Sequence, residues 1–185
     1  MIQNHINDHL AVVRNSFSES LIKDLERAGD LIAQKIKIGG KVIIFGNGGS
    51  AADAQHLAAE FISKLDKNRI SLPALALTVD TSALTAISND YGFEFVFERQ
   101  LSSLCQKSDV VIGISTSGKS MNVLNGLRKA NQIGATTIGF SGVDGIKDFN
   151  PDFTFRAASK ITARIQEVHI IYSHLLCAQA ERCYV

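Results

Sequence analysis

Apolar residues in the first part of the chain recur at steps of three and four positions. This spacing places them on one stripe of a helix and predicts a long amphipathic helix that ends at Gly39-Gly40. The stripe consists of Ile2, Ile6, Leu10, Val13, Phe17, Leu21, Leu25, Ile32 and Ile36. A second long helix is predicted at the other end of the chain, from Ile161 to about Arg182. The chain is therefore expected to begin and end in helices.

Between these two helices, short apolar runs alternate with helical segments. Strands are predicted over 41–45, 74–79, 110–114 and 136–140, with an edge strand over 153–155. Helices are predicted from 50 to about 62, over 82–88 with Ser82 as the cap, over 95–105, and over 120–133 with Gly134 as the stop. Fully apolar strands that alternate with helices indicate a parallel sheet covered on both faces. We expect one α/β domain over residues 1–185, a three-layer sandwich around a mainly parallel five-stranded sheet.

Composition narrows the class of protein. The 185 residues are 45% hydrophobic and 20% charged, which is typical of a globular domain, and the formal charge is only +1. Such a balance argues against a general binder of nucleic acid or of acidic membranes. The apolar runs are much shorter than a membrane span, and the first residues do not resemble a signal peptide. Three cysteines without a CxxC pair indicate neither a disulfide framework nor a zinc ribbon, so a cytoplasmic protein is expected.

Ligands of such sheets bind at the carboxyl ends of the strands, where two loops carry candidate chemistry. The loop Ser115-Thr116-Ser117-Gly118-Lys119-Ser120 lies between a buried strand and a helix start. Free backbone N–H groups and the helix dipole attract anions there, and short hydroxyl side chains add donors. The alternative is plain capping by Ser117 or Ser120. Because one cap needs one hydroxyl, the four in this loop favour a phosphate site. The loop is not a Walker A motif.

The other loop, Gly46-Asn47-Gly48-Gly49-Ser50-Ala51, fits the weak dinucleotide pattern G-x-G-x-x-A. That fingerprint needs an acidic residue about 20 positions further on, at the end of the next strand. Asp66 has the distance but lies in a charged turn, whereas Asp80 follows a strand but lies too far away. A tight turn, or close approach of the backbone to a sugar with Asn47 and Ser50 as polar contacts, are equally open interpretations.

Two helices carry side chains suited to metal or acid–base chemistry. His56 and Glu60 are four residues apart and share a helix face, where they form either a hydrogen-bonded pair or a metal or catalytic pair. Gln166 and His174 are eight residues apart, so both return toward one face of the terminal helix. Taken alone, His174 is better explained as a hydrogen-bonded histidine of the core. The remaining histidines are expected to be structural or exposed: His5, His9 and His169.

Taken together, residues 46–56, 115–120 and 164–169 resemble the phosphoheptose isomerase branch of the sugar isomerase (SIS) domain family. The resemblance runs nearly end to end. It implies an isomerase that converts D-sedoheptulose 7-phosphate to D-glycero-D-manno-heptose 7-phosphate through a metal-assisted enediol(ate). That reaction is the first step toward activated heptose (ADP-heptose) for lipopolysaccharide or surface polysaccharide. The resemblance also implies a homotetramer, in which residues 1–38 pack between subunits. The balanced charge predicts no nucleic-acid or membrane partner.

The same resemblance implies the roles of individual residues. One zinc ion per subunit would be held by His56, Glu60, Gln166 and His174. Glu60 would also act as the base and His174 as its partner acid. Substrate would be bound by Asn47, Gly48, Gly49, Ser50, Glu60, Asn89, Asp90, Ser115, Thr116, Ser117, Ser120 and Gln166, with the four hydroxyl residues on the phosphate.

Two other classes of function compete with the enzyme. Relatives on the same fold include an adaptor that binds the bacterial replication initiator protein and regulators that sense sugar phosphates. A nicotinamide-dependent oxidoreductase is supported only by the glycine loop. A binding module does not need a carboxylate base that faces histidine and glutamine on a second helix. The four side chains therefore favour an isomerase, provided that the early and terminal helices converge in space.

Overall fold

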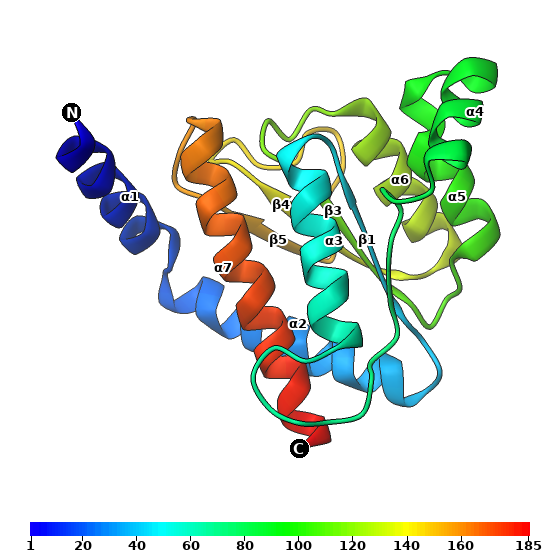
Figure 1. Ribbon diagram of the computed structural model, residues 1–185, viewed down its shortest axis with the longest axis horizontal. Helices are drawn as coiled ribbons and strands as arrows, with labels where there is room; N and C mark the ends of the chain where they lie inside the picture. Colours follow the sequence, from blue (N-terminus) through cyan, green and yellow to red (C-terminus); the bar gives the residue numbers. More distant parts are fainter.

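A five-stranded sheet forms the centre of the computed structural model, which describes residues 1–185 (Figure 1). The strands lie in the order β2-β1-β3-β4-β5, and every neighbouring pair is parallel. The elements are α1 (Ile2–Ser16), α2 (Glu19–Lys37), β1 (Val42–Gly46), α3 (Gly49–Ile62), β2 (Ala74–Ala76), α4 (Thr81–Tyr91), α5 (Val96–Leu104), β3 (Val110–Ser115), α6 (Met121–Ile133), β4 (Thr136–Ser141), β5 (Phe153–Arg156) and α7 (Thr162–Glu181).

Helices cover both faces of the sheet, as the apolar strands predict. Successive side chains of a strand point to opposite faces. Accordingly, Val42 and Ile44 of β1 belong to a large core cluster with residues of α2, α3 and α7. Ile43 and Phe45 belong to a smaller cluster with residues of α5 and α6. The expected three-layer α/β sandwich with long helices near both ends is confirmed (Figure 1).

The first helix is not continuous, and this is the main correction to the predicted elements. Its apolar stripe runs without interruption, yet the helix breaks at Phe17 and Ser18. Ser18 is extended, and its hydroxyl accepts a hydrogen bond from the backbone N–H of Leu21 at 3.2 Å, so it caps α2. Phe17 turns inward and packs edge-on against Tyr172 of α7, with ring centroids 5.2 Å apart. The break frees α1 to leave the body of the molecule.

Two inner elements differ from their predicted bounds for similar local reasons. Strand β2 ends at Ala76 rather than near Val79, because the chain turns after the N–H of Leu77 has bonded the carbonyl of Ile44. Helix α4 is longer than predicted and is capped by Asp80 rather than Ser82. The Asp80 carboxylate accepts from the N–H of Ala83 at 2.9 Å.

Other predicted ends agree with the structure. Gly134 ends α6 in the left-handed conformation, with φ of 87°, where glycine avoids the strain that a side chain would bring. Strand β5 is the edge strand beside β4. None of the helices is both long enough and apolar enough to cross a membrane.

Candidate active site

The two loops that carry the sequence motifs lie side by side at the carboxyl edge of the sheet. Strands β1 and β3 are parallel neighbours, and Gly46 pairs with Ile114 in the register. Each strand therefore releases its loop at the same level. The glycine loop 46–51 and the hydroxyl loop 115–120 follow directly. The two loops are more than sixty residues apart along the chain, and the pairing of β1 with β3 brings them together.

The glycine loop needs glycine at specific positions. Gly48 precedes α3 with φ of 56°, a conformation that L side chains rarely adopt. A Cβ atom on Gly49 would collide with the side-chain amide of Gln166 from α7. A Cβ atom on Gly46 would lie 2.9 Å from the carbonyl oxygen of Ile114. These glycines therefore let β3 and α7 approach the start of α3.

A buried residue that sequence reasoning missed holds the glycine loop. The side-chain amides of Asn47 and Asn122 exchange two hydrogen bonds, at 2.9 and 2.8 Å, and Asn122 is buried at the start of α6. The Asn122 oxygen also accepts from the N–H of Val123 at 2.9 Å. The available signal was a lone amide in the first, otherwise apolar, turn of α6. Asn122 thereby fixes Asn47 at the mouth between the two loops.

The hydroxyl loop does not use its hydroxyls to cap α6. Ser120 occupies the cap position but makes no side-chain capping bond, and its hydroxyl instead accepts from Ser115 at 3.0 Å. The Ser117 hydroxyl accepts from the N–H of Lys119 at 3.2 Å. Thr116, Ser117 and Lys119 line one side of a hollow of about 190 Å³. The capping alternative is therefore wrong for Ser117 and Ser120. The Asn122 side chain bonds the N–H of Val123, and the rest of the first turn of α6 keeps the dipole and N–H groups that favour an anion.

Three of the four proposed ligand side chains come together between α3 and α7. Nε2 of His56 lies 2.9 Å from Nε2 of His174 and 3.4 Å from a carboxylate oxygen of Glu60. One nitrogen or oxygen of each residue lies within 4.8 Å of the others. The two helices pack against each other and run in the same direction (Figure 1). Convergence of the early and terminal helices, on which the enzyme interpretation depends, is present in the fold.

The donor set of this cluster fits a first-row divalent metal. Two imidazoles and a carboxylate are common zinc ligands, and other first-row metals accept them as well. At a Zn–N distance of about 2.0–2.1 Å, two tetrahedral nitrogen ligands lie about 3.3 Å apart. The 2.9 Å between the two Nε2 atoms is slightly shorter, so a small ring rotation would accommodate the ion.

The fourth proposed ligand, Gln166, lies elsewhere on the same helix face. Its amide group packs against Gly49, at the first turn of α3. Gly49 precedes His56 by seven residues, or about 10 Å of helix rise. The contacts of Gln166 therefore connect it to the glycine loop rather than to the imidazole pair.

The other predicted site residues fall into two groups. Gly48, Gly49 and Ser50 begin α3, with Ser50 buried behind the loop. Asn89 and Asp90 are exposed on α4, where the Asn89 amide donates to the Asp90 carboxylate at 2.8 Å. Of the acidic residues considered for a dinucleotide, Asp80 is used as the cap of α4. Asp66 lies in the turn after α3, where its N–H donates to Glu181 at the end of α7.

Burial alters the pKa of Asp53, beside the cluster, and of His169, in the core. Burial raises the pKa of Asp53, an effect that the nearby His56 partly offsets. One oxygen of Asp53 is buried without a hydrogen-bond partner. Sequence reasoning gave Asp53 no role, although it precedes His56 by one helix turn. Burial lowers the pKa of His169 to about 4, so this imidazole is neutral and structural, as expected.

His9, a third histidine outside the cluster, pairs with Glu167 on α7 at 2.6 Å.

Comparison with known proteins gives concordant matches. Residues 6–142 match the family model for the SIS domain. A phosphoheptose isomerase from Aquifex aeolicus is 52% identical over 172 residues, which cover 92% of this chain and 90% of the relative. A phosphoheptose isomerase structure from Neisseria gonorrhoeae is 39% identical with a TM-score of 0.84, covering 98% of this chain and 100% of its own. A phosphoheptose isomerase structure from Francisella tularensis is 30% identical with a TM-score of 0.91, and the match covers 98% of this chain and 96% of that chain.

Proposed function

The chain belongs to the phosphoheptose isomerases of the SIS domain family and is an isomerase, and from this we propose that it converts D-sedoheptulose 7-phosphate to D-glycero-D-manno-heptose 7-phosphate. The observation that carries the proposal is the convergence of His56, Glu60 and His174 from α3 and α7. An aldose–ketose isomerase needs a base and an acid on one substrate, and a carboxylate beside an imidazole supplies both.

The reaction moves a carbonyl from C2 to C1 of the sugar. A proton leaves C1 and another is delivered to C2, through an enediol. We assign proton removal to Glu60, and proton delivery to His174, whose ring lies across from it on α7. Glu60 has two carboxylate oxygens, so one can face a metal while the other takes the proton. Zinc held by His56, Glu60 and His174 would polarise the substrate carbonyl as a Lewis acid. Gln166 would join them as a further ligand only after its amide turns from Gly49 toward the imidazoles.

The two loops would hold the ends of the substrate. Ser115, Thr116, Ser117 and Ser120 lie at the start of α6, which the Ser120 hydroxyl does not cap, and we assign the phosphate to them. This arrangement offers hydroxyl donors, backbone N–H groups and the positive end of the helix dipole. The sugar hydroxyls would contact the glycine loop residues Asn47, Gly48, Gly49 and Ser50, together with Glu60, Gln166, Asn89 and Asp90.

The wider setting follows from the substrate and from the surface of α1. The proposed product is a heptose phosphate on the route to ADP-heptose for lipopolysaccharide or surface polysaccharide, and phosphorylated sugars are made and used in the cytoplasm. We propose a homotetramer in which residues 1–38 pack between subunits, and one zinc ion per subunit. Exposed apolar residues on α1 support the packing, namely Ile2, Ile6 and Leu10.

An assay with sedoheptulose 7-phosphate tests the proposed function. The protein should form the aldose phosphate, lose activity after dialysis against a chelator, and recover it with Zn²⁺. Glu60→Gln should remain folded and lose activity by about 10³-fold or more, because an amide cannot accept the proton. Circular dichroism and thermal unfolding report its fold. Wild-type turnover in Glu60→Gln would refute the assignment of the base, and absence of product from the wild type would refute the substrate.

A further inference from the structure

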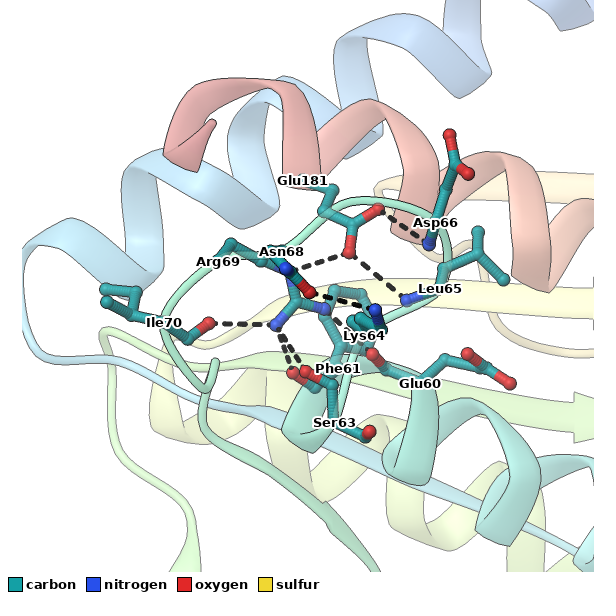
Figure 2. A network of polar contacts seen from close by, with 10 residues as sticks. All are labelled: Glu60, Phe61, Ser63, Lys64, Leu65, Asp66, Asn68, Arg69, Ile70 and Glu181. Atoms are coloured by element: carbon teal, nitrogen blue, oxygen red, sulfur yellow. Dashed lines mark hydrogen bonds and ion pairs between the residues drawn. The ribbon is translucent and has the colours of Figure 1, made fainter.

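A buried arginine closes the turn that follows α3, and none of the roles assigned above involves it. Arg69 lies in the segment between α3 and β2, and its side chain has an exposed fraction of 0%. Its Nε atom donates to the carboxylate of Glu181, the last residue of α7, at 2.8 Å (Figure 2). Glu181 is also buried, with an exposed fraction of 3%. This is an ion pair held away from water.

The guanidinium of Arg69 binds the last turn of α3. Nη2 donates to the carbonyl oxygen of Glu60 at 2.8 Å, and Nη1 donates to the carbonyl oxygen of Phe61 at 2.8 Å. The final carbonyl groups of a helix have no partner within it, and a cation there also complements the helix dipole. Figure 2 shows the Glu60 carboxylate pointing away from Arg69 while its carbonyl is held. Arg69 therefore fixes the backbone from which the proposed base projects.

Glu181, the carboxylate of this ion pair, holds the end of α7 against the turn after α3. The two carboxylate oxygens of Glu181 accept from the backbone N–H groups of Leu65 at 3.1 Å and Asp66 at 3.3 Å (Figure 2). His174 precedes Glu181 on the same helix by seven residues, or about 10 Å of rise. The pair thus joins the helix of His56 and Glu60 to the helix of His174 below the point where these side chains meet.

We propose that Arg69 and Glu181 are positioning residues that set the separation of Glu60 and His174. This role rests on the proposed function of the cluster. Acid–base and metal-binding groups must be held within about 0.5 Å of their working geometry. Partners that orient such groups typically change activity or metal affinity by about 10–100-fold when removed. A buried ion pair that served stability alone could be replaced by apolar residues of similar volume with little cost.

The double variant Arg69→Met/Glu181→Leu separates positioning from stability. Apolar replacement keeps the volume filled but leaves the last carbonyls of α3 and the N–H groups of Leu65 and Asp66 without partners, so the melting temperature should fall. Activity is therefore compared in the folded protein, well below that temperature. The carbonyl of Glu60 loses its donor, and kcat should fall by about 10–100-fold while KM for the sugar phosphate changes little. The affinity of the metal-free protein for Co²⁺, followed by its visible absorption, should fall in parallel.

Lys41→Met is the matched control. Lys41 pairs at 2.7 Å with Asp109, which is fully buried at the amino-terminal edge of the sheet, opposite the edge that carries the glycine and hydroxyl loops. Its loss should lower the melting temperature without changing kcat or Co²⁺ affinity of the folded protein. If the double variant does not fold, Arg69→Lys replaces it. Lysine keeps the charge but cannot reach Glu181 and the carbonyls of α3 at once, so the same losses are expected at smaller size.

Wild-type kcat and Co²⁺ affinity in the folded double variant, or in Arg69→Lys where the double variant does not fold, would overturn the positioning role. That outcome leaves the proposed function intact, because the wild type is active. If the wild type neither isomerises sedoheptulose 7-phosphate nor binds Co²⁺, the proposed function fails and the positioning role fails with it.

Discussion

At the scale of residues, burial distinguishes a structural histidine from a histidine of the candidate site. His169 and His174 lie on α7 five positions apart. His169 is fully buried, its Nε2 lies 3.0 Å from the carbonyl oxygen of Ser141, and its Nδ1 has no partner. Its proton therefore belongs on Nε2, and burial keeps the ring neutral. His174 is only partly buried and reaches His56 on another helix. The same side chain thus serves packing at one position and the candidate site at the other.

His169 predicts a loss of stability in acid. Its pKa is lowered by burial from 6.5 to about 4 in the folded state. As the pH falls below about 6.5, the unfolded chain binds a proton that the folded chain does not, so the free energy of unfolding decreases. The loss approaches about 3 kcal/mol at pH 4. Urea unfolding between pH 7 and pH 4 measures it. His169→Gln should show a weaker pH dependence, whereas His5→Gln, at an exposed position, should not; equal slopes in wild type and His169→Gln would contradict the prediction.

At the scale of elements, capping and loop contacts decide details that hydrophobic spacing leaves open. The apolar stripe is the same through α1 and α2, but the Ser18 cap and the inward turn of Phe17 divide them. The hydroxyl loop shows the opposite case, since a serine at the cap position of α6 does not cap it. Its hydroxyls bond within the loop instead. The loop therefore keeps an open helix start for a ligand.

The hydroxyl loop predicts a binding defect rather than a chemical one. Phosphate contacts persist in both substrate and transition state, so Ser117→Ala should raise KM with kcat nearly unchanged. Loss of one hydrogen bond to a charged group corresponds to about 1.5 kcal/mol, or about tenfold in KM. Steady-state kinetics on sedoheptulose 7-phosphate measure both constants. Ser102→Ala, which removes a hydroxyl bonded to the Glu98 carbonyl on α5, is the control. A large fall in kcat at constant KM would speak against a phosphate contact.

At the scale of the whole molecule, α1 is only loosely integrated with the rest. It projects from the body of the molecule (Figure 1), and only Ser16 at its end is buried. Val12 and Val13 near its end pack against the core, whereas its first half contacts α7 through polar bonds, from His9 to Glu167 and from Arg164 to the carbonyl of His5. Ile2, Ile6 and Leu10 remain exposed at four-residue spacing. A helix with an apolar stripe gains stability by burying that stripe, which a second subunit can provide.

The exposed stripe predicts that α1 supports assembly. Leu10, with an exposed fraction of 57%, should be buried between subunits, so Leu10→Glu should shift the protein to smaller species. Size-exclusion chromatography with light scattering, or sedimentation velocity, measures the shift. Leu104→Glu is the matched control, because Leu104 is 43% exposed at the end of α5. An unchanged mass in Leu10→Glu, or an equal change in the control, would exclude a role of the stripe in assembly.

The sequence by itself determined the elements of the fold and the chemistry of its loops. Apolar runs and helical spacing are local, so they predicted the five strands, the flanking helices apart from the break at Phe17 and Ser18, and the two loops at the carboxyl ends of their strands. Side-chain type and spacing likewise pointed to His56 with Glu60 and to His174, and the structure brings these three together. The metal, the substrate contacts and the assembly stay predictions.

Only the tertiary structure decided which distant groups meet. It placed Gln166 against Gly49 rather than beside the imidazoles, gave Asn47 its partner Asn122, and joined Arg69 to Glu181. Spacing along one helix sets a residue's direction, whereas contact between helices depends on their packing offset. That offset arises from many long-range contacts of the core at once, and no local period in the sequence records it.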